Sequence, residues 1–114
     1  MMAVTRTQIP SSPVRDVELV PGLDALADAF DSLKGRAEYQ RFLRDLCTLS
    51  ELEALAHRWQ IATLLDEGAL SYLEIAERAG GSTATVTRVA QWLRAGAGGY
   101  RAALERTRRS RERG

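Results

Sequence analysis

The sequence predicts an all-α protein of about six helices, two of which form a helix-turn-helix. Apolar residues recur at three- and four-residue spacing from residue 22 onwards. Two Ser/Thr-x-x-Glu patterns, at residues 48–51 and 71–74, are typical of helix starts. Glycines then separate the periodic segments, as at Gly80-Gly81. The 114 residues suit one domain with a modest core.

Three segments are expected along the chain. Residues 1–21 contain three prolines and no sustained period, which predicts a flexible N-terminal arm. Residues 22–106 carry the helical pattern and form the expected folded domain. Residues 107–114 are an Arg-rich tail, and residues 101–114 together hold six arginines against two glutamates. This basic end either contacts polyanions such as phosphates or is simply solvated.

The first two predicted helices each have one apolar face. The first is expected to end near Gly35, and its apolar positions are Leu23, Leu26, Ala27, Phe30 and Leu33. The second runs from Arg36 to Leu46, with Tyr39, Phe42, Leu43 and Leu46 on one stripe.

The third predicted helix is apolar around much of its circumference. It begins at the capping box of residues 48–51 and ends at Gly68. Its main stripe is broadened by Ile61, Leu64 and Leu65 beyond the apolar width usual for a surface helix. Such a helix must be covered on several sides, so in this short chain we expect a second subunit to cover it.

The helix-turn-helix is predicted over residues 71–94. A short helix follows Ser71 and stops at Gly80-Gly81, and Ser82 caps a helix that continues to Leu93. Ala76 leaves room where the two helices cross, while an apolar wedge is expected from Ile75, Val86 and Val89. The alternative is an ordinary helical hairpin.

The outer face of the second of these helices carries side chains suited to a DNA major groove. Its predicted contact residues are Ser82, Thr83, Ala84, Thr85, Thr87, Arg88 and Gln91. Thr hydroxyls reach bases or phosphates, Thr methyls touch the thymine methyl, and Arg or Gln can form two bonds to guanine or adenine. The alternative is a solvated polar face. Residues 96–100 then break the helix, and a last helix is expected from Tyr100 to about Arg108.

Other classes of protein have little support in the sequence. No apolar run approaches the ~20 residues of a membrane helix, no secretory signal is evident, and one cysteine excludes an internal disulfide, so a cytoplasmic location is expected. His57 has no further ligands at metal-binding spacing. The glutamate pairs are better explained by caps and solvated faces, so we expect no enzyme, no cofactor and no metal.

The segment from Leu46 to Gly96 resembles the tryptophan repressor superfamily, and the motifs "DLCT" from Asp45, "STATVTRV" from Ser82 and "GGY" from Gly98 resemble its bacterial YerC/YecD-type branch. The resemblance extends from about residue 22 to about residue 106. It implies a helical DNA-binding domain that forms an intertwined homodimer, whose two helix-turn-helix units enter successive major grooves. Half-sites ~34–36 Å apart are then expected.

The same resemblance raises the question of a small-molecule effector. In tryptophan-sensing members two arginines hold the ligand, and they correspond to Arg58 and Arg88. The small residues that leave room for the ligand are replaced by Val89 and Trp92. The indole of Trp92 is expected to fill that space, so tryptophan is predicted to be unnecessary, and a smaller effector is left open.

The sequence therefore predicts a homodimeric, sequence-specific regulator of transcription that binds double-stranded DNA, with a repressor as the expected type. The alternative is a helical dimerisation or adaptor module that binds a protein partner through the same helices.

Overall fold

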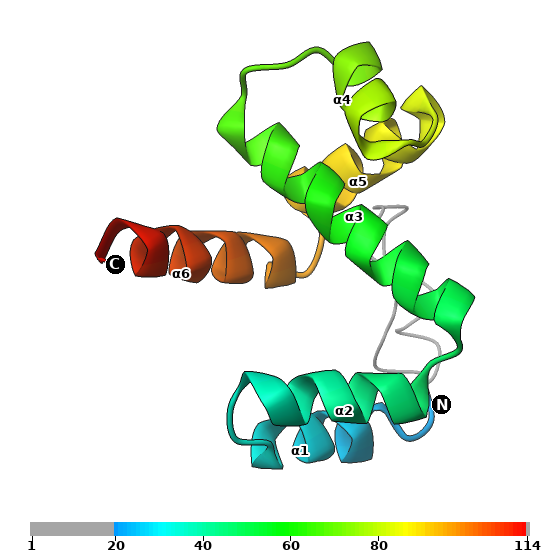
Figure 1. The fold of residues 1–114 in the computed structure, drawn as a ribbon, viewed down its shortest axis with the longest axis vertical. Helices are drawn as coiled ribbons and strands as arrows, with labels where there is room; N and C mark the ends of the chain where they lie inside the picture. Colours follow the sequence, from blue (N-terminus) through cyan, green and yellow to red (C-terminus); the bar gives the residue numbers. More distant parts are fainter. Residues whose placement is uncertain (1–19, 114) are drawn as a thin grey trace, which may run out of the picture. The chain divides into compact units, whose positions relative to one another are not determined.

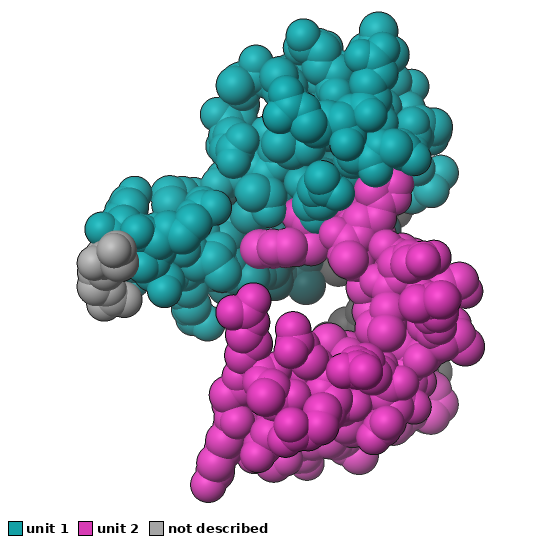
Figure 2. Space-filling model, in the orientation of Figure 1, with its two compact units in different colours: residues 1–15, 60–114 teal, residues 16–59 magenta. Residues whose placement is uncertain are grey.

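The computed structural model describes residues 20–113, and within this range the secondary structure consists of six α-helices (Figure 1). The chain divides into two compact units, one of residues 16–59 and the other of residues 60–114 with residues 1–15 (Figure 2). Most of the expected N-terminal arm, residues 1–19, lies outside the described range. The all-α class and the number of helices are confirmed.

The unit of residues 16–59 contains α1 (Leu23–Ser32), α2 (Arg36–Leu46) and the first half of α3 (Leu49–Glu67). The rings of Phe30 on α1 and Phe42 on α2 meet edge to face, with their centroids 5.2 Å apart. Helix α2 begins where Glu38 accepts a hydrogen bond from the backbone N–H of Lys34 at 2.7 Å. The predicted bounds of α2 are thus confirmed.

Helix α1 ends three residues before the predicted position near Gly35. The Ser32 hydroxyl donates to the Ala29 carbonyl at 2.7 Å, and Leu33 is already extended, with φ −76° and ψ 147°. Gly35 then takes a φ of 87°, which a helix cannot accommodate. Gly35 is therefore part of the turn between the two helices rather than the end of the first.

Capping contacts at the start of α3 confirm the predicted box. The Thr48 hydroxyl accepts from the Glu51 backbone N–H at 3.1 Å, and Glu51 accepts from the Thr48 backbone N–H at 2.8 Å. At the other end the helix stops before Gly68, whose φ is 73°. Both ends of this 19-residue helix therefore follow from local sequence signals.

The unit of residues 60–113 holds the end of α3 together with α4 (Tyr72–Ala79), α5 (Thr83–Ala95) and α6 (Gly99–Arg113). Among residues 20–112, whose burial is described, every fully buried side chain belongs to this unit: Ile61, Ala62, Ile75, Ala76, Val86, Val89, Ala90 and Leu104. Helices α1 and α2 contribute none. Within the described range, the buried core is therefore small and built around α4 and α5.

Helix α6 continues beyond the predicted end near Arg108 and reaches Arg113. Its sequence is rich in Ala, Arg and Glu, which are strong helix formers. Arg109 and Glu105, four residues apart, form an ion pair at 2.7 Å that supports the added turns. The Arg-rich end is therefore helical as far as Arg113, beyond the helix end predicted near Arg108.

Candidate nucleic-acid interface

Helices α4 and α5, joined by a short turn, occupy the segment predicted as the helix-turn-helix, and hydrogen bonds set the start of α4. Ser71 and Glu74 make a complete capping box, with the Ser71 N–H donating to the carboxylate at 2.8 Å. This backbone hydrogen bond, followed by the Ser71 hydroxyl, lowers the pKa of Glu74 below its ordinary value. The carboxylate therefore stays ionised at the positive end of the helix.

The turn between α4 and α5 depends on Gly80, which adopts the left-handed conformation with φ 82° and ψ 30°. The backbone N–H groups of Gly80 and Gly81 both donate to the Ala76 carbonyl, at 2.8 and 2.9 Å. Two N–H groups that donate to one carbonyl close the C-terminus of the helix. Glycine is preferred there because the left-handed conformation costs it little. The predicted helix end at Gly80-Gly81 is confirmed, and Ala76, which is predicted to lie where the two helices cross, is buried.

The two faces of α5 differ in burial as the helical wheel predicts. Val86, Val89 and Ala90 are buried against the rest of the unit, and Leu93 is half-buried. The opposite face is exposed to solvent and carries Thr83, Ala84, Thr87, Arg88 and Gln91. The N-cap residue Ser82 is exposed as well. Six of the seven predicted contact residues are therefore exposed.

Thr85 is the exception among these residues, because it is half-buried and takes part in the cap. Ser82 Oγ accepts from the Thr85 backbone N–H at 3.2 Å and lies 3.2 Å from the Thr85 hydroxyl. The Thr85 side chain therefore takes part in the hydrogen bonds at the start of α5. Thr87 also has an internal partner, since its hydroxyl donates to the Thr83 carbonyl at 2.9 Å. These hydroxyl contacts were not anticipated from the sequence.

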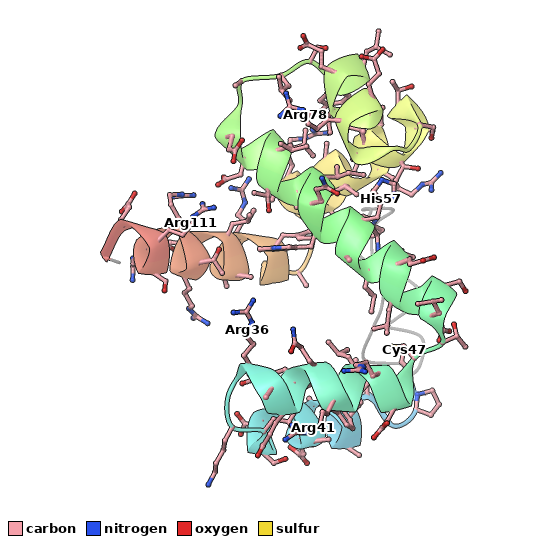
Figure 3. The ribbon with its side chains drawn as sticks, viewed as in Figure 1. Arg36, Arg41, Cys47, His57, Arg78 and Arg111 are labelled. Atoms are coloured by element: carbon pink, nitrogen blue, oxygen red, sulfur yellow. The ribbon has the colours of Figure 1, made fainter. Side chains whose placement is uncertain are left out.

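Arg88 is an exposed cation in the N-terminal half of α5. It makes no ion pair with any residue in the described part of the chain, and it lies five residues after the helix start at Thr83. A guanidinium presents a fixed set of donors, so an exposed and unpaired one is available to a guanine edge or a phosphate. Arg78, on the neighbouring α4, is exposed too and is labelled in Figure 3.

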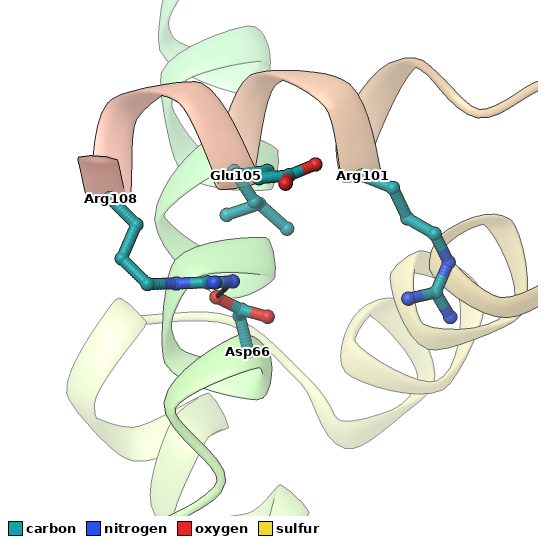
Figure 4. A pocket seen from close by; sticks show the side chains of 5 residues that line it. Asp66, Arg101, Glu105 and Arg108 are labelled. Atoms are coloured by element: carbon teal, nitrogen blue, oxygen red, sulfur yellow. Dashed lines mark hydrogen bonds and ion pairs between the residues drawn. The ribbon is translucent and has the colours of Figure 1, made fainter. Parts of the chain in front are cut away.

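Two of the arginines of α6 are held by acidic partners. Arg108 donates to Asp66 on α3 at 3.0 Å, and the hydrogen bond and charge of Asp66 raise the pKa of Arg108 (Figure 4). This pair borders an open hollow of about 260 Å³ that Arg101, Leu104 and Glu105 also line. Arg111 points away from α6 (Figure 3). Asp66 lies outside the Arg-rich residues 101–114. Its pairing with Arg108 therefore leaves these residues with less uncompensated positive charge than their composition suggests.

The four residues predicted to form an effector pocket differ in their burial and lie in two different units. On α5, Val89 is buried with 2% exposure, Trp92 is half-buried and Arg88 is exposed. Arg58 lies in the other unit, on the first half of α3, where it borders an open hollow of about 430 Å³ with Leu46, Cys47 and other residues of that unit. Val89 is thus a core residue, so its methyl groups already fill space beneath α5.

The described residues show no feature of a metal site or a membrane segment. No three His, Cys, Asp or Glu side chains of residues 20–113 gather into a group that could hold a metal ion. Over the same range, no helix has the length and apolar composition to cross a membrane. The Nε2 atom of His57 is buried without a hydrogen-bond partner among these residues, a feature that residue type and spacing do not predict.

Comparison with known proteins gives concordant matches. A family model described as "Trp repressor protein" matches residues 21–108. The uncharacterized protein YerC of Bacillus subtilis (strain 168) is 42% identical over 86 residues, which is 75% of this chain and 82% of YerC. Two crystal structures also superpose on 82% of this chain and 95% of their own. A candidate Trp repressor from Staphylococcus aureus has a TM-score of 0.74 at 35% identity, and a TrpR-like protein from Eubacterium eligens ATCC 27750 has 0.73 at 36%.

Proposed function

The chain belongs to the Trp repressor family, and from this premise we propose that it is a homodimeric, sequence-specific DNA-binding regulator of transcription. The supporting observation is the exposed face of α5, where polar side chains follow a capped helix start and the opposite face is buried. A helix held in this way can enter a major groove with its N-terminal residues against the base edges. Repression is the expected mode of regulation.

The homodimer is supported by the unit of residues 16–59. Its described residues include no fully buried side chain, although α1 and α2 are amphipathic. Large apolar side chains remain exposed there, with Leu46 at 49% and Leu49 at 73%. Apolar surface of this extent favours association, and a second copy of the chain is the proposed partner. Two copies related by a two-fold axis would present two α5 helices to one duplex.

The proposal is tested by selecting bound duplexes from a random pool and measuring affinity over a salt series. We expect an enriched motif with two-fold symmetry and half-sites ~10–10.5 base pairs apart. The logarithm of the binding constant should fall linearly with the logarithm of the salt concentration, with a slope of about −0.9 for each phosphate neutralised. Failure to enrich any duplex would overturn the proposed function.

A protein-binding adaptor is the second candidate. The observation in its favour is that Tyr72 and Leu73, on the first turn of α4, are 40% and 60% exposed. An apolar protein contact would keep its affinity as salt is raised, whereas phosphate contacts would not. The same salt series therefore separates the two functions.

We further propose that DNA binding does not require tryptophan. Val89 is buried in the core of its unit, and Trp92 supplies a large indole on the same helix. In a close-packed interior, these side chains leave little room for a second indole. Calorimetric titration is expected to show no micromolar binding of tryptophan and no change in affinity for the selected duplex. Micromolar binding that also tightened the DNA complex would contradict this prediction.

A further inference from the structure

The hydrogen bonds of α5 limit what its hydroxyl groups can offer to DNA. The Thr87 hydroxyl donates its one proton to the Thr83 carbonyl at 2.9 Å. Phosphate oxygens only accept hydrogen bonds, so Thr87 in this conformation cannot donate to a phosphate. Breaking the internal bond to free the proton would cost roughly the 0.5–1.5 kcal/mol that such a bond contributes. Thr87 is nevertheless exposed on the proposed contact face.

The Thr87 oxygen can still accept a hydrogen bond but has no proton left to donate, and the group that Thr87 can offer for an apolar contact is its methyl. Ala84, three residues earlier on α5, is also exposed, and residues at this spacing are neighbours on a helix surface. The two side chains form a small apolar patch, with Arg88 and Gln91 next to it on the same exposed face. In the major groove, thymine is the base that presents a methyl group, at C5.

We propose that Ala84 and Thr87 read a thymine methyl in each half-site, and that Thr87 does so through its own methyl rather than its hydroxyl. The inference rests on the proposed function, because it assigns a base to the same surface. It also predicts which chemical change in DNA the protein detects: loss of a single methyl group, with every Watson–Crick contact retained.

The test uses the duplex selected by the full-length protein, with each thymine replaced in turn by deoxyuridine, which lacks only the methyl. One position in each half-site is expected to weaken binding about fourfold, as burial of one methyl group implies. Other thymines serve as internal controls and should be unaffected. This measurement uses the natural protein, so it does not depend on whether a variant folds.

Two substitutions separate the methyl from the hydroxyl. Thr87→Val keeps a methyl and removes the hydroxyl, so it should retain affinity and still distinguish thymine from uracil. Thr87→Ser keeps the hydroxyl and loses the methyl, so it should bind about fourfold more weakly per half-site and no longer distinguish the two bases. Circular dichroism and the unfolding midpoint establish that both variants are folded.

Two results would overturn the inference while leaving the proposed function intact. One is a selected duplex in which no deoxyuridine substitution weakens binding by the wild-type protein. The other is the reverse pattern, in which Thr87→Ser binds normally and Thr87→Val does not, because the hydroxyl would then make the contact. A pool that yields no bound duplex would instead remove the proposed function, and the inference with it.

Discussion

Arg88→Ala is expected to weaken binding of the selected duplex by about 5- to 150-fold per half-site, the range that corresponds to loss of one good base contact. Arg88 is exposed on α5 and forms no ion pair among the described residues, so its removal should leave the fold unchanged. Fluorescence anisotropy with a labelled duplex measures the change in dissociation constant. Unchanged affinity would reject this face of α5 as the contact surface.

Arg94→Ala is the matched control, since Arg94 is an exposed arginine in the last turn of the same helix. It removes the same charge at a position outside the proposed contact residues, and its effect should be much smaller. Arg88→Lys adds a second comparison. It keeps the charge but loses the two-bond geometry, so discrimination between bases should fall more than affinity for unrelated DNA.

Ile75→Ala is expected to lower the free energy of unfolding by about 2–5 kcal/mol, the usual cost of emptying a buried aliphatic site. Ile75 is on α4, has no exposed surface and belongs to the small core that holds α4 and α5 together. The loss combines the transfer free energy of the removed carbons with the cavity that remains. Urea unfolding followed by circular dichroism measures it.

Leu73→Ala provides the comparison on the same helix, because Leu73 is 60% exposed. Its substitution should change the free energy of unfolding by no more than about 0.5 kcal/mol. Similar losses for the two variants would show that α4 does not pack as described. A large loss for Ile75→Ala alone would show that the core around Ile75 stabilises the fold and that the exposed Leu73 does not.

Much of the helix-turn-helix was predictable because its signals are local. The capping box of Ser71 and Glu74, the left-handed turn at Gly80 and the cap at Ser82 each involve residues within four positions of one another. Such hydrogen bonds depend on short-range geometry that residue type and spacing largely specify. The exposed face of α5 followed from the helical period for the same reason.

The predictions that failed concern helix ends without a strong local signal. Helix α1 ends at Ser32, where a side-chain hydrogen bond competes with the backbone. Helix α6 extends to Arg113, where arginine and glutamate pair along the helix. In both cases several weak contributions of similar size decide the boundary, and residue type alone does not rank them.

By itself, the sequence of this protein determined the class of fold, the six helices, the helix-turn-helix and the polar face that we propose contacts DNA, because each depends on neighbours in the chain. Only the tertiary structure decided that every buried apolar side chain among the described residues belongs to the unit of residues 60–113, and that Arg108 pairs with Asp66, 42 residues away. It also decided that the Thr87 hydroxyl faces the Thr83 carbonyl. Long-range contacts and side-chain rotamers depend on how helices pack, which spacing along the chain does not specify.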